Sequence, residues 1–188
     1  MKEIALHLLD LAENSVSAGA KTVQISICED QSADLLTTCI EDDGRGMTPE
    51  MVKMVTDPFV TSRVTRKVGL GIPLFKAAAE ECGGGLEIQS TPAVGTRVEA
   101  RFQHSHIDRM PLGNLPTTVL GLSVAHPEIH WIFRYTARAN GAEKTFEYDD
   151  QPIKETLDGL PITHPEVLAW LRGMLEEGIA AAQKILNS

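Results

Sequence analysis

A run of strand-forming residues, LLTTCIED, passes without a break into a turn that contains Gly44 and Gly46. This pattern predicts a strand that delivers Asp42 into the turn. Glycine allows a close approach of the backbone, so the turn can lie directly against a planar ring. A carboxylate at the strand end can accept a hydrogen bond from an amino group on that ring. Taken alone, the same spacing is also typical of ordinary turns and of calcium-binding loops.

A second polar feature lies on the first predicted helix, residues 3–17. Apolar residues recur there at helical spacing, and Ser15 lies on the apolar stripe. Asp10 and Asn14 are four residues apart, so they would lie one turn apart on the same face. Neither residue type favours the interior of a helix, which indicates a polar ligand beside this face. An ordinary amphipathic helix is the alternative interpretation.

The third segment, KVGLGIPLF, opens a predicted helix over residues 71–82. Gly69 and Gly71 would leave backbone N–H groups free at the helix N-terminus, where the helix dipole favours anions. The loop before it contains three cations, Arg63, Arg66 and Lys67, in a protein of net charge -9. Two glycines at this spacing are weak evidence alone, and the dinucleotide pattern GxGxxG is absent from the sequence.

In their order and spacing, the three segments resemble the N, G1 and G2 boxes of the GHKL superfamily, which includes DNA gyrase, the large heat-shock chaperone, histidine kinases and mismatch-repair ATPases. GTRVEARF is similar to the closing G3 strand of that family. The resemblance covers residues 3 to about 103. It implies an α+β fold of the Bergerat type, which is a two-layer α/β sandwich. A mixed sheet carries helices on one face, and ATP binds between the layers.

The resemblance also implies roles for individual residues. Asn14 would be the Mg²⁺ ligand, Asp42 would bind the adenine with Thr96 beside it, and the backbone after residue 68 would hold the phosphates. The residues expected to contact the nucleotide are Asn14, Ser17, Asp42, Gly44, Gly46, Met47, Arg63, Lys67, Gly69, Leu70, Gly71 and Thr96.

The sequence departs from the family pattern at three positions. ATPase members carry Glu four residues before the Asn, whereas this chain has Asp10, which is one methylene shorter. Asp10 is therefore the expected catalytic base, and its short reach predicts slow hydrolysis. Ser17 stands where histidine kinases usually carry Lys. Lys67 stands where they often carry the first glycine of the G2 box.

The remaining residues suggest a second structural unit. We expect a nucleotide-binding domain over residues 1–105 and a C-terminal extension over residues 106–188. Asn140 and Gly141 mark a hairpin turn, because both positions of such a turn need positive φ. The elements predicted in the extension are strands at 117–125, 129–139 and 142–149 and a helix at 164–187.

Composition restricts the partners of the chain. A net charge of -9 does not favour nucleic acid or an anionic membrane through bulk electrostatics. No apolar run reaches the length that crosses a bilayer, and three cysteines at long spacings fit a reducing compartment, so we expect a cytoplasmic protein. His126 and His130 are four residues apart, but Pro127 and the strand pattern give them no common helical face for a metal.

ATP and Mg²⁺ are thus the expected ligands, while the use of ATP stays open. One hypothesis is a stand-alone regulatory protein, kinase-like or anti-sigma-like, that acts on a protein partner in trans. A second is a slow ATPase that works as an ATP-gated switch and changes its partner or forms a homodimer. A third is a non-catalytic nucleotide-binding module.

Overall fold

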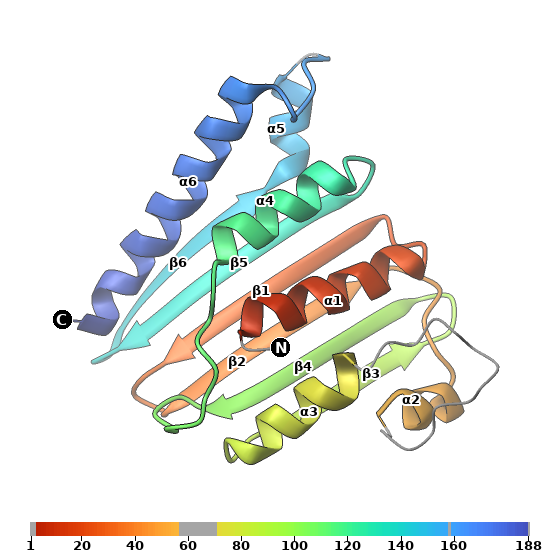
Figure 1. Cartoon of the computed structure of the whole chain (residues 1–188), viewed down its shortest axis with the longest axis vertical. Coiled ribbons are helices and arrows are strands. Elements are labelled where there is room, and N and C mark those ends of the chain that lie inside the picture. The colour runs from red at the N-terminus through yellow and green to blue at the C-terminus, as the bar shows by residue number, and fades with distance from the viewer. Residues whose placement is uncertain (1–2, 57–70, 158, 188) are drawn as a thin grey trace.

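The computed structural model describes residues 3–56, 71–157 and 159–187, and the description below concerns these residues. One six-stranded sheet has the strand order β3-β4-β2-β1-β5-β6 (Figure 1). Its strands are β1 (Thr22–Asp30), β2 (Leu35–Asp42), β3 (Gly85–Thr91), β4 (Gly95–Gln103), β5 (His130–Ala139) and β6 (Ala142–Asp149). The helices are α1 (Ile4–Ser17), α2 (Pro49–Thr56), α3 (Gly71–Glu81), α4 (Leu115–Ala125), α5 (Asp150–Thr156) and α6 (Pro165–Gln183), followed by the short 3₁₀ helix η1 (Lys184–Asn187).

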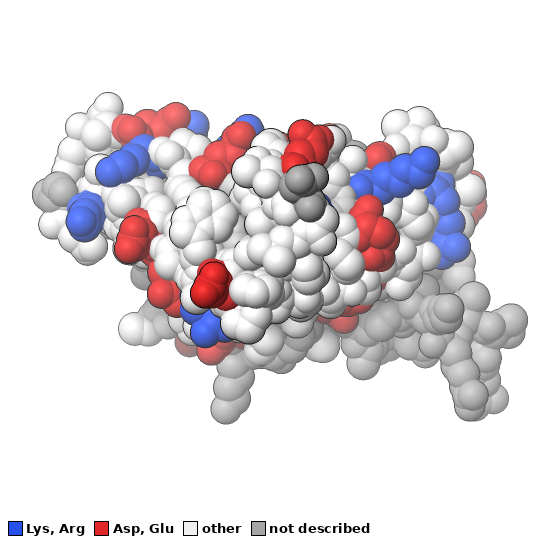
Figure 2. Space-filling view, turned by 90° about the horizontal axis from the view of Figure 1, so that it is seen from above, with Lys and Arg blue, Asp and Glu red and all other residues white. Residues whose placement is uncertain are grey.

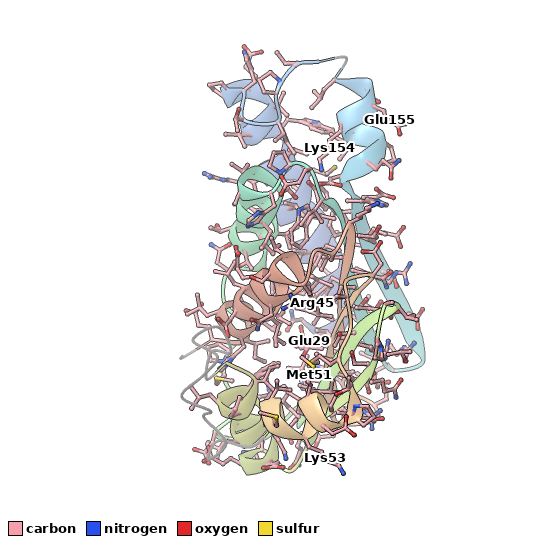
Figure 3. The ribbon with its side chains drawn as sticks, turned by 90° about the vertical axis from the view of Figure 1, so that its right-hand side faces the viewer. Glu29, Arg45, Met51, Lys53, Lys154 and Glu155 are labelled. Atoms are coloured by element: carbon pink, nitrogen blue, oxygen red, sulfur yellow. The ribbon has the colours of Figure 1, made fainter. Side chains whose placement is uncertain are left out.

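The two faces of the sheet differ because successive side chains of a strand point to opposite sides. In β1, Val23, Ile25 and Ile27 are buried under α1 and its neighbouring helices. Seen edge-on in Figure 3, the helical layer lies on one side of the sheet. The other face carries cross-strand ion pairs such as Arg134–Glu147, with 2.6 Å between Nη2 and Oε2. This arrangement confirms the predicted mixed sheet with helices on one face.

Helix α1, which carries Asp10 and Asn14, is anchored at its start by the loop after β4. At its start, the amides of Ile4 and Ala5 donate to the carbonyls of Pro111 and Leu112 at 3.0 and 2.9 Å. These bonds satisfy N–H groups that have no partner within the helix itself. The helix ends before Gly19, whose φ of 76° suits a glycine. The loop after β4 therefore holds the helix that bears two of the predicted site residues.

The C-terminal strands extend the sheet that the earlier strands form. β5 pairs in parallel with β1, so that Val23 lies beside Trp131. β5 and β6 form the predicted hairpin, with Asn140 and Gly141 at φ of 52° and 78°. α6 packs on these two strands through Val167, Leu171, Leu175, Ile179 and Ala182. No helix in the described ranges is long and apolar enough to cross a membrane.

The prediction of a strand at residues 117–125 was wrong, because this segment is helix α4. A short apolar run fits a buried strand and a buried helix equally well. The local signals for a helix lie just before it. The Asn114 side chain accepts from the Thr117 amide at 2.9 Å, and Pro116 occupies the first turn. α5 was not predicted either. Its cap is Asp149, which accepts from the Gln151 amide at 3.0 Å.

Candidate functional site

The Asp42 carboxylate lies at the end of β2 and joins three parts of the site. Its Oδ2 accepts from the Ser15 hydroxyl of α1 at 2.7 Å, and its Oδ1 accepts from the Gly44 amide at 2.9 Å. Thr96 of β4 lies directly opposite Asp42 in the sheet register. Each carboxylate oxygen has two lone pairs, so Asp42 can accept a further hydrogen bond from a ligand.

The turn after Asp42 requires its glycines. Gly46 has a φ of 63°, and a Cβ added there would overlap the Thr91 carbonyl. A Cβ at Gly44 would lie 2.9 Å from Asp42 Oδ1 and 3.0 Å from the Ala18 Cβ. Gly44 therefore lets the turn lie close to the residue after α1, and Gly46 lets it lie close to the β3–β4 hairpin.

A hydroxyl pair continues the polar floor of the site. The Ser90 and Thr96 hydroxyls are 2.8 Å apart, and the Met47 amide donates to Ser90 Oγ at 2.8 Å. Ser90 thereby links the turn after β2 to the β3–β4 hairpin. Asp42, Thr96 and the turn are held as one rigid unit.

A cavity of about 140 Å³ opens between α1 and this floor. Asn14 and Arg45 supply polar groups to its wall, and both Met47 and Met51 line it. Arg45 and Met51 are labelled in Figure 3. The full lining is Leu11, Asn14, Ser15, Ala18, Ile40, Asp42, Arg45, Gly46, Met47, Met51, Val55, Ile72, Thr96 and Val98. Apolar walls around a few convergent polar groups are typical of small-ligand sites.

A larger hollow of about 440 Å³ lies at the end of the sheet and includes side chains of its uncovered face. Gln24, Gln89 and Arg97 line it, together with Asp42 and Thr96. Arg97 there already pairs with Glu41, with 3.2 Å between Nη1 and Oε2. Asn14 and the turn residues Arg45, Gly46 and Met47 line only the smaller of the two cavities. We therefore assign the candidate ligand site to the smaller cavity.

Asp10 lies on α1 and faces the start of α3. A Cβ added at Gly71, the first residue of α3, would overlap Asp10 Oδ2 and lie 2.8 Å from its Cγ. The carboxylate is thus packed against the helix N-terminus, and a side chain at residue 71 would displace it. Asp10 does not line the 140 Å³ cavity itself.

The structure brings five of the twelve predicted nucleotide contacts together. Asn14, Asp42, Gly46, Met47 and Thr96 line one cavity. Gly44 adjoins this cavity through Asp42, and Gly71 adjoins Asp10. Ser17 is exposed at the end of α1 and does not line the cavity. The other predicted contacts, Arg63, Lys67, Gly69 and Leu70, lie outside the described residues.

Sequence reasoning missed two polar residues of the cavity, Ser15 and Arg45. Ser15 had a signal, because a hydroxyl in the apolar stripe of a helix needs a partner when it is buried. That partner is Asp42. Arg45 is the residue between the two glycines, and its amide donates to the Ala18 carbonyl at 3.0 Å. Nothing in its sequence context distinguished it from a solvated turn residue.

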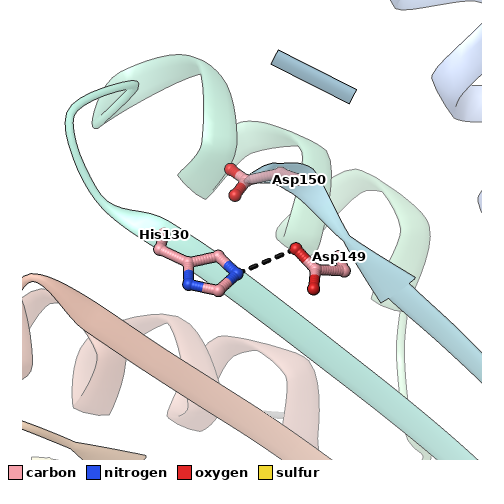
Figure 4. Close-up of side chains that lie close together, drawn as sticks. All are labelled: His130, Asp149 and Asp150. Atoms are coloured by element: carbon pink, nitrogen blue, oxygen red, sulfur yellow. Dashed lines mark hydrogen bonds and ion pairs between the residues drawn. The ribbon is translucent and has the colours of Figure 1, made fainter. Parts of the chain in front are cut away.

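The histidines of the HPEIH segment lie apart from the cavity and have separate partners. His126 Nε2 is 3.1 Å from Glu13 Oε1, whereas His130 Nε2 is 2.8 Å from Asp149 Oδ1 (Figure 4). Asp150 lies close to this second pair, so the three side chains could hold a metal ion.

The contacts of Asp150 indicate a structural role for that cluster. Its Oδ1 accepts from the Trp131 amide at 2.9 Å, and its Oδ2 lies 2.7 Å from Lys154 Nζ. Burial raises the pKa of the carboxyl, while Lys154 and the amide lower it. Because a lysine already neutralises Asp150, we interpret the cluster as the attachment of α5 to β5.

His7 is a buried histidine one turn before Asp10. Its ring stacks on Phe75 with 4.6 Å between the ring centroids, and its Nδ1 has no hydrogen-bond partner among the described residues. Burial lowers its pKa to about 4. The ring is therefore uncharged at neutral pH.

We expect His7 to make the protein less stable as the pH falls. The unfolded chain takes up a proton near pH 6.5, whereas the folded chain resists it until about pH 4. The free energy of unfolding should thus decrease by about 3 kcal/mol between these values because of His7. Urea unfolding of wild-type and His7→Leu proteins across this range should show the smaller pH dependence in the variant. His106→Leu is the control and should keep the pH dependence of the wild type. If the free energy of unfolding changes with pH equally in wild-type and His7→Leu proteins, the assignment is contradicted.

The fold is a two-layer α/β sandwich, and comparison with known proteins gives its family. The model of the histidine kinase-, DNA gyrase B-, and HSP90-like ATPase family matches residues 2–106, which is more than half of the chain. The chain therefore belongs to this family.

Two curated relatives illustrate the match. The chain is 33% identical over 101 residues to the sensor protein SrrB of Staphylococcus aureus, a region that covers 51% of this chain and 17% of SrrB. It is 31% identical over 120 residues to the cell-division control histidine kinase PdhS of Brucella anthropi, which covers 57% of this chain and 11% of PdhS. The chain thus spans less than a fifth of the length of these relatives.

A solved structure shares the fold. It is the N-terminal domain of a DNA repair protein, with a TM-score of 0.52 and 14% sequence identity. The alignment covers 77% of this chain and 52% of that chain. At this identity the likeness concerns the fold alone.

Proposed function

We propose that the chain binds ATP with Mg²⁺ in the cavity between α1 and the sheet. The observation that supports this most directly is the position of Asp42 on the cavity floor, held by Ser15 and Gly44 and beside Thr96. The adenine amino group would donate to Asp42, and the glycine turn would lie against the ring. A cavity of about 140 Å³ is smaller than a typical site for a whole ligand. We therefore place the adenine of ATP inside the cavity and its phosphates outside.

The residues around the cavity also fit a magnesium ion. Mg²⁺ prefers oxygen ligands, and Asn14 supplies a side-chain oxygen on the cavity wall. Bound Mg²⁺ would neutralise part of the charge on the phosphates. The N-terminus of α3, beginning at Gly71, is an anion-binding position on the same side of α1 as Asp10. The chain thus offers groups for the base, the metal ion and the phosphates.

We further propose a regulatory, kinase-like or anti-sigma-like protein that acts on a protein partner in trans. The support is the similarity to part of a sensor protein and part of a histidine kinase. In addition, four of the six histidines are poorly placed to accept a phosphoryl group. His104, His126 and His130 each contact a carboxylate, and His7 is buried.

Surface charge is compatible with a protein partner. On the face shown in Figure 2, acidic and basic side chains are interspersed between broad uncharged areas. Incubation with γ-labelled ATP, of the protein alone and in cell extract, tests the proposal. Transfer of label to another protein would support a kinase in trans. Release of phosphate without transfer, together with nucleotide-dependent self-association, would favour the ATP-gated switch and a homodimer instead.

Asn14→Ala is expected to weaken ATP binding about tenfold in Mg²⁺ and by less than about twofold in EDTA, because the lost oxygen serves the metal ion. Calorimetric titrations in both buffers measure the two affinities. Glu13→Gln, next to Asn14 on the same helix and exposed, is the control and should change each value by less than about twofold. Equal losses in Mg²⁺ and in EDTA would remove Asn14 from the metal shell.

A further inference from the structure

The charge of Asp10 lies where the phosphates of a nucleotide are expected. The Asp10 carboxylate packs directly on Gly71, the first residue of the 11-residue helix α3. A helix N-terminus attracts anions through its free N–H groups and its dipole. In this structure Asp10 is the anion at that helix end.

None of the described groups around Asp10 forms an ion pair with it. His7, one turn earlier on α1, is uncharged at neutral pH because burial lowers its pKa to about 4. Among the residues that the structure describes, no Lys or Arg forms an ion pair with Asp10. A phosphate that reaches the start of α3 therefore meets the negative charge of Asp10. The Asp10 carboxylate can lie there because Gly71 has no side chain.

We infer that Asp10 makes the site discriminate against metal-free nucleotide. Metal-free ATP brings its full negative charge towards the carboxylate, and the two compete for one helix end. ATP with bound Mg²⁺ carries less charge and suffers less repulsion. Asp10 is thus a specificity-determining residue for the metal-bound form of the nucleotide. This inference rests on the proposed function, and it is separate from the prediction that Asp10 activates water.

Glu13 provides a matched control on the same helix. It carries the same charge as Asp10, but it lies about 60° away around the helix. It contacts His126, with 3.1 Å between Oε1 and Nε2, and its side chain is 47% exposed. Glu13→Gln and Asp10→Asn therefore each remove one negative charge from α1. Only Asp10→Asn removes a charge that lies at the start of α3.

The test is a titration of ATP and of adenosine into wild-type, Asp10→Asn and Glu13→Gln proteins, in EDTA and in Mg²⁺. In EDTA, Asp10→Asn should bind ATP about fivefold to tenfold more tightly than wild type, and Glu13→Gln should stay within about twofold. In Mg²⁺ the gain of Asp10→Asn should shrink to less than about twofold. Adenosine, which has no phosphate, should bind equally to all three proteins, which also shows that the variants are folded.

Two results would overturn the inference. One is an Asp10→Asn protein that binds metal-free ATP no more tightly than wild type, and the other is an equal gain in Glu13→Gln. If wild-type protein binds neither ATP nor adenosine, the proposed function itself fails. The two failures are therefore distinguishable.

Discussion

Removing residues 163–188 is expected to abolish cooperative folding of the chain. The deleted helix α6 buries Val167, Leu171, Leu175, Ile179 and Ala182 on β5 and β6. Burying a large aliphatic side chain contributes about 1.5 to 3 kcal/mol, so the helix contributes on the order of 10 kcal/mol. This is comparable with the whole free energy of unfolding of a typical domain. The truncated chain should be poorly soluble or change its oligomeric state.

Point substitutions on α6 test the same packing without a deletion. Leu171 is fully buried, whereas its neighbour Trp170 is 57% exposed. Leu171→Ala should lower the free energy of unfolding by about 2 to 5 kcal/mol, and Trp170→Ala should change it by less than about 1 kcal/mol. Urea unfolding followed by circular dichroism measures both. A truncated chain that stays monomeric and unfolds at the wild-type midpoint would show that α6 is a detachable tail.

Asp42→Asn is expected to weaken ATP binding by about tenfold to a hundredfold. The substitution keeps the shape of the side chain but removes the charge that strengthens a hydrogen bond from the adenine amino group, worth about 1.5 to 3 kcal/mol. It also replaces one of the two oxygens that bind Ser15 and Gly44 by an NH₂ donor. Calorimetric titration with ATP and Mg²⁺ measures the change.

Asp43→Asn is the matched control for this substitution. Asp43 is exposed, does not line the 140 Å³ cavity, and accepts instead from the amides of Lys21 and Thr22 at 2.6 and 2.9 Å. The Asp43→Asn protein should bind ATP within about threefold of wild type, because water screens the effect of an exposed charge outside the cavity on the bound nucleotide. An unchanged dissociation constant in Asp42→Asn would remove Asp42 from the adenine site.

The parts of the site that the sequence predicts are those set by local chemistry. A glycine pair after a strand, polar residues four apart on a helix and a glycine at a helix start each have a cause within a few residues. Asp42, Asn14 and Gly71 were predicted in this way. The contact between Asp10 and Gly71 joins residues that are 61 positions apart in the sequence, and no local pattern predicts it.

The C-terminal half shows where local patterns fail. The apolar run at 117–125 has no clear period, and Asn114, which caps it as a helix, lies in a stretch that looks like a linker. The hairpin of β5 and β6 was predicted from Asn140 and Gly141, because the turn itself specifies it. The parallel pairing of β5 with β1 is a long-range contact, which depends on how the whole helical layer packs.

The central claim is that ATP binds between α1 and the strand end at Asp42, and amide chemical shifts of the ¹⁵N-labelled protein test it most directly. On titration with ATP and Mg²⁺, the largest shift changes should map to Asn14, residues 42–47, Thr96 and Gly71. Gln24, Gln89 and Arg97, which line the larger hollow, should change little. Saturable shifts centred on these three residues, or no saturable shifts at all, would contradict the account.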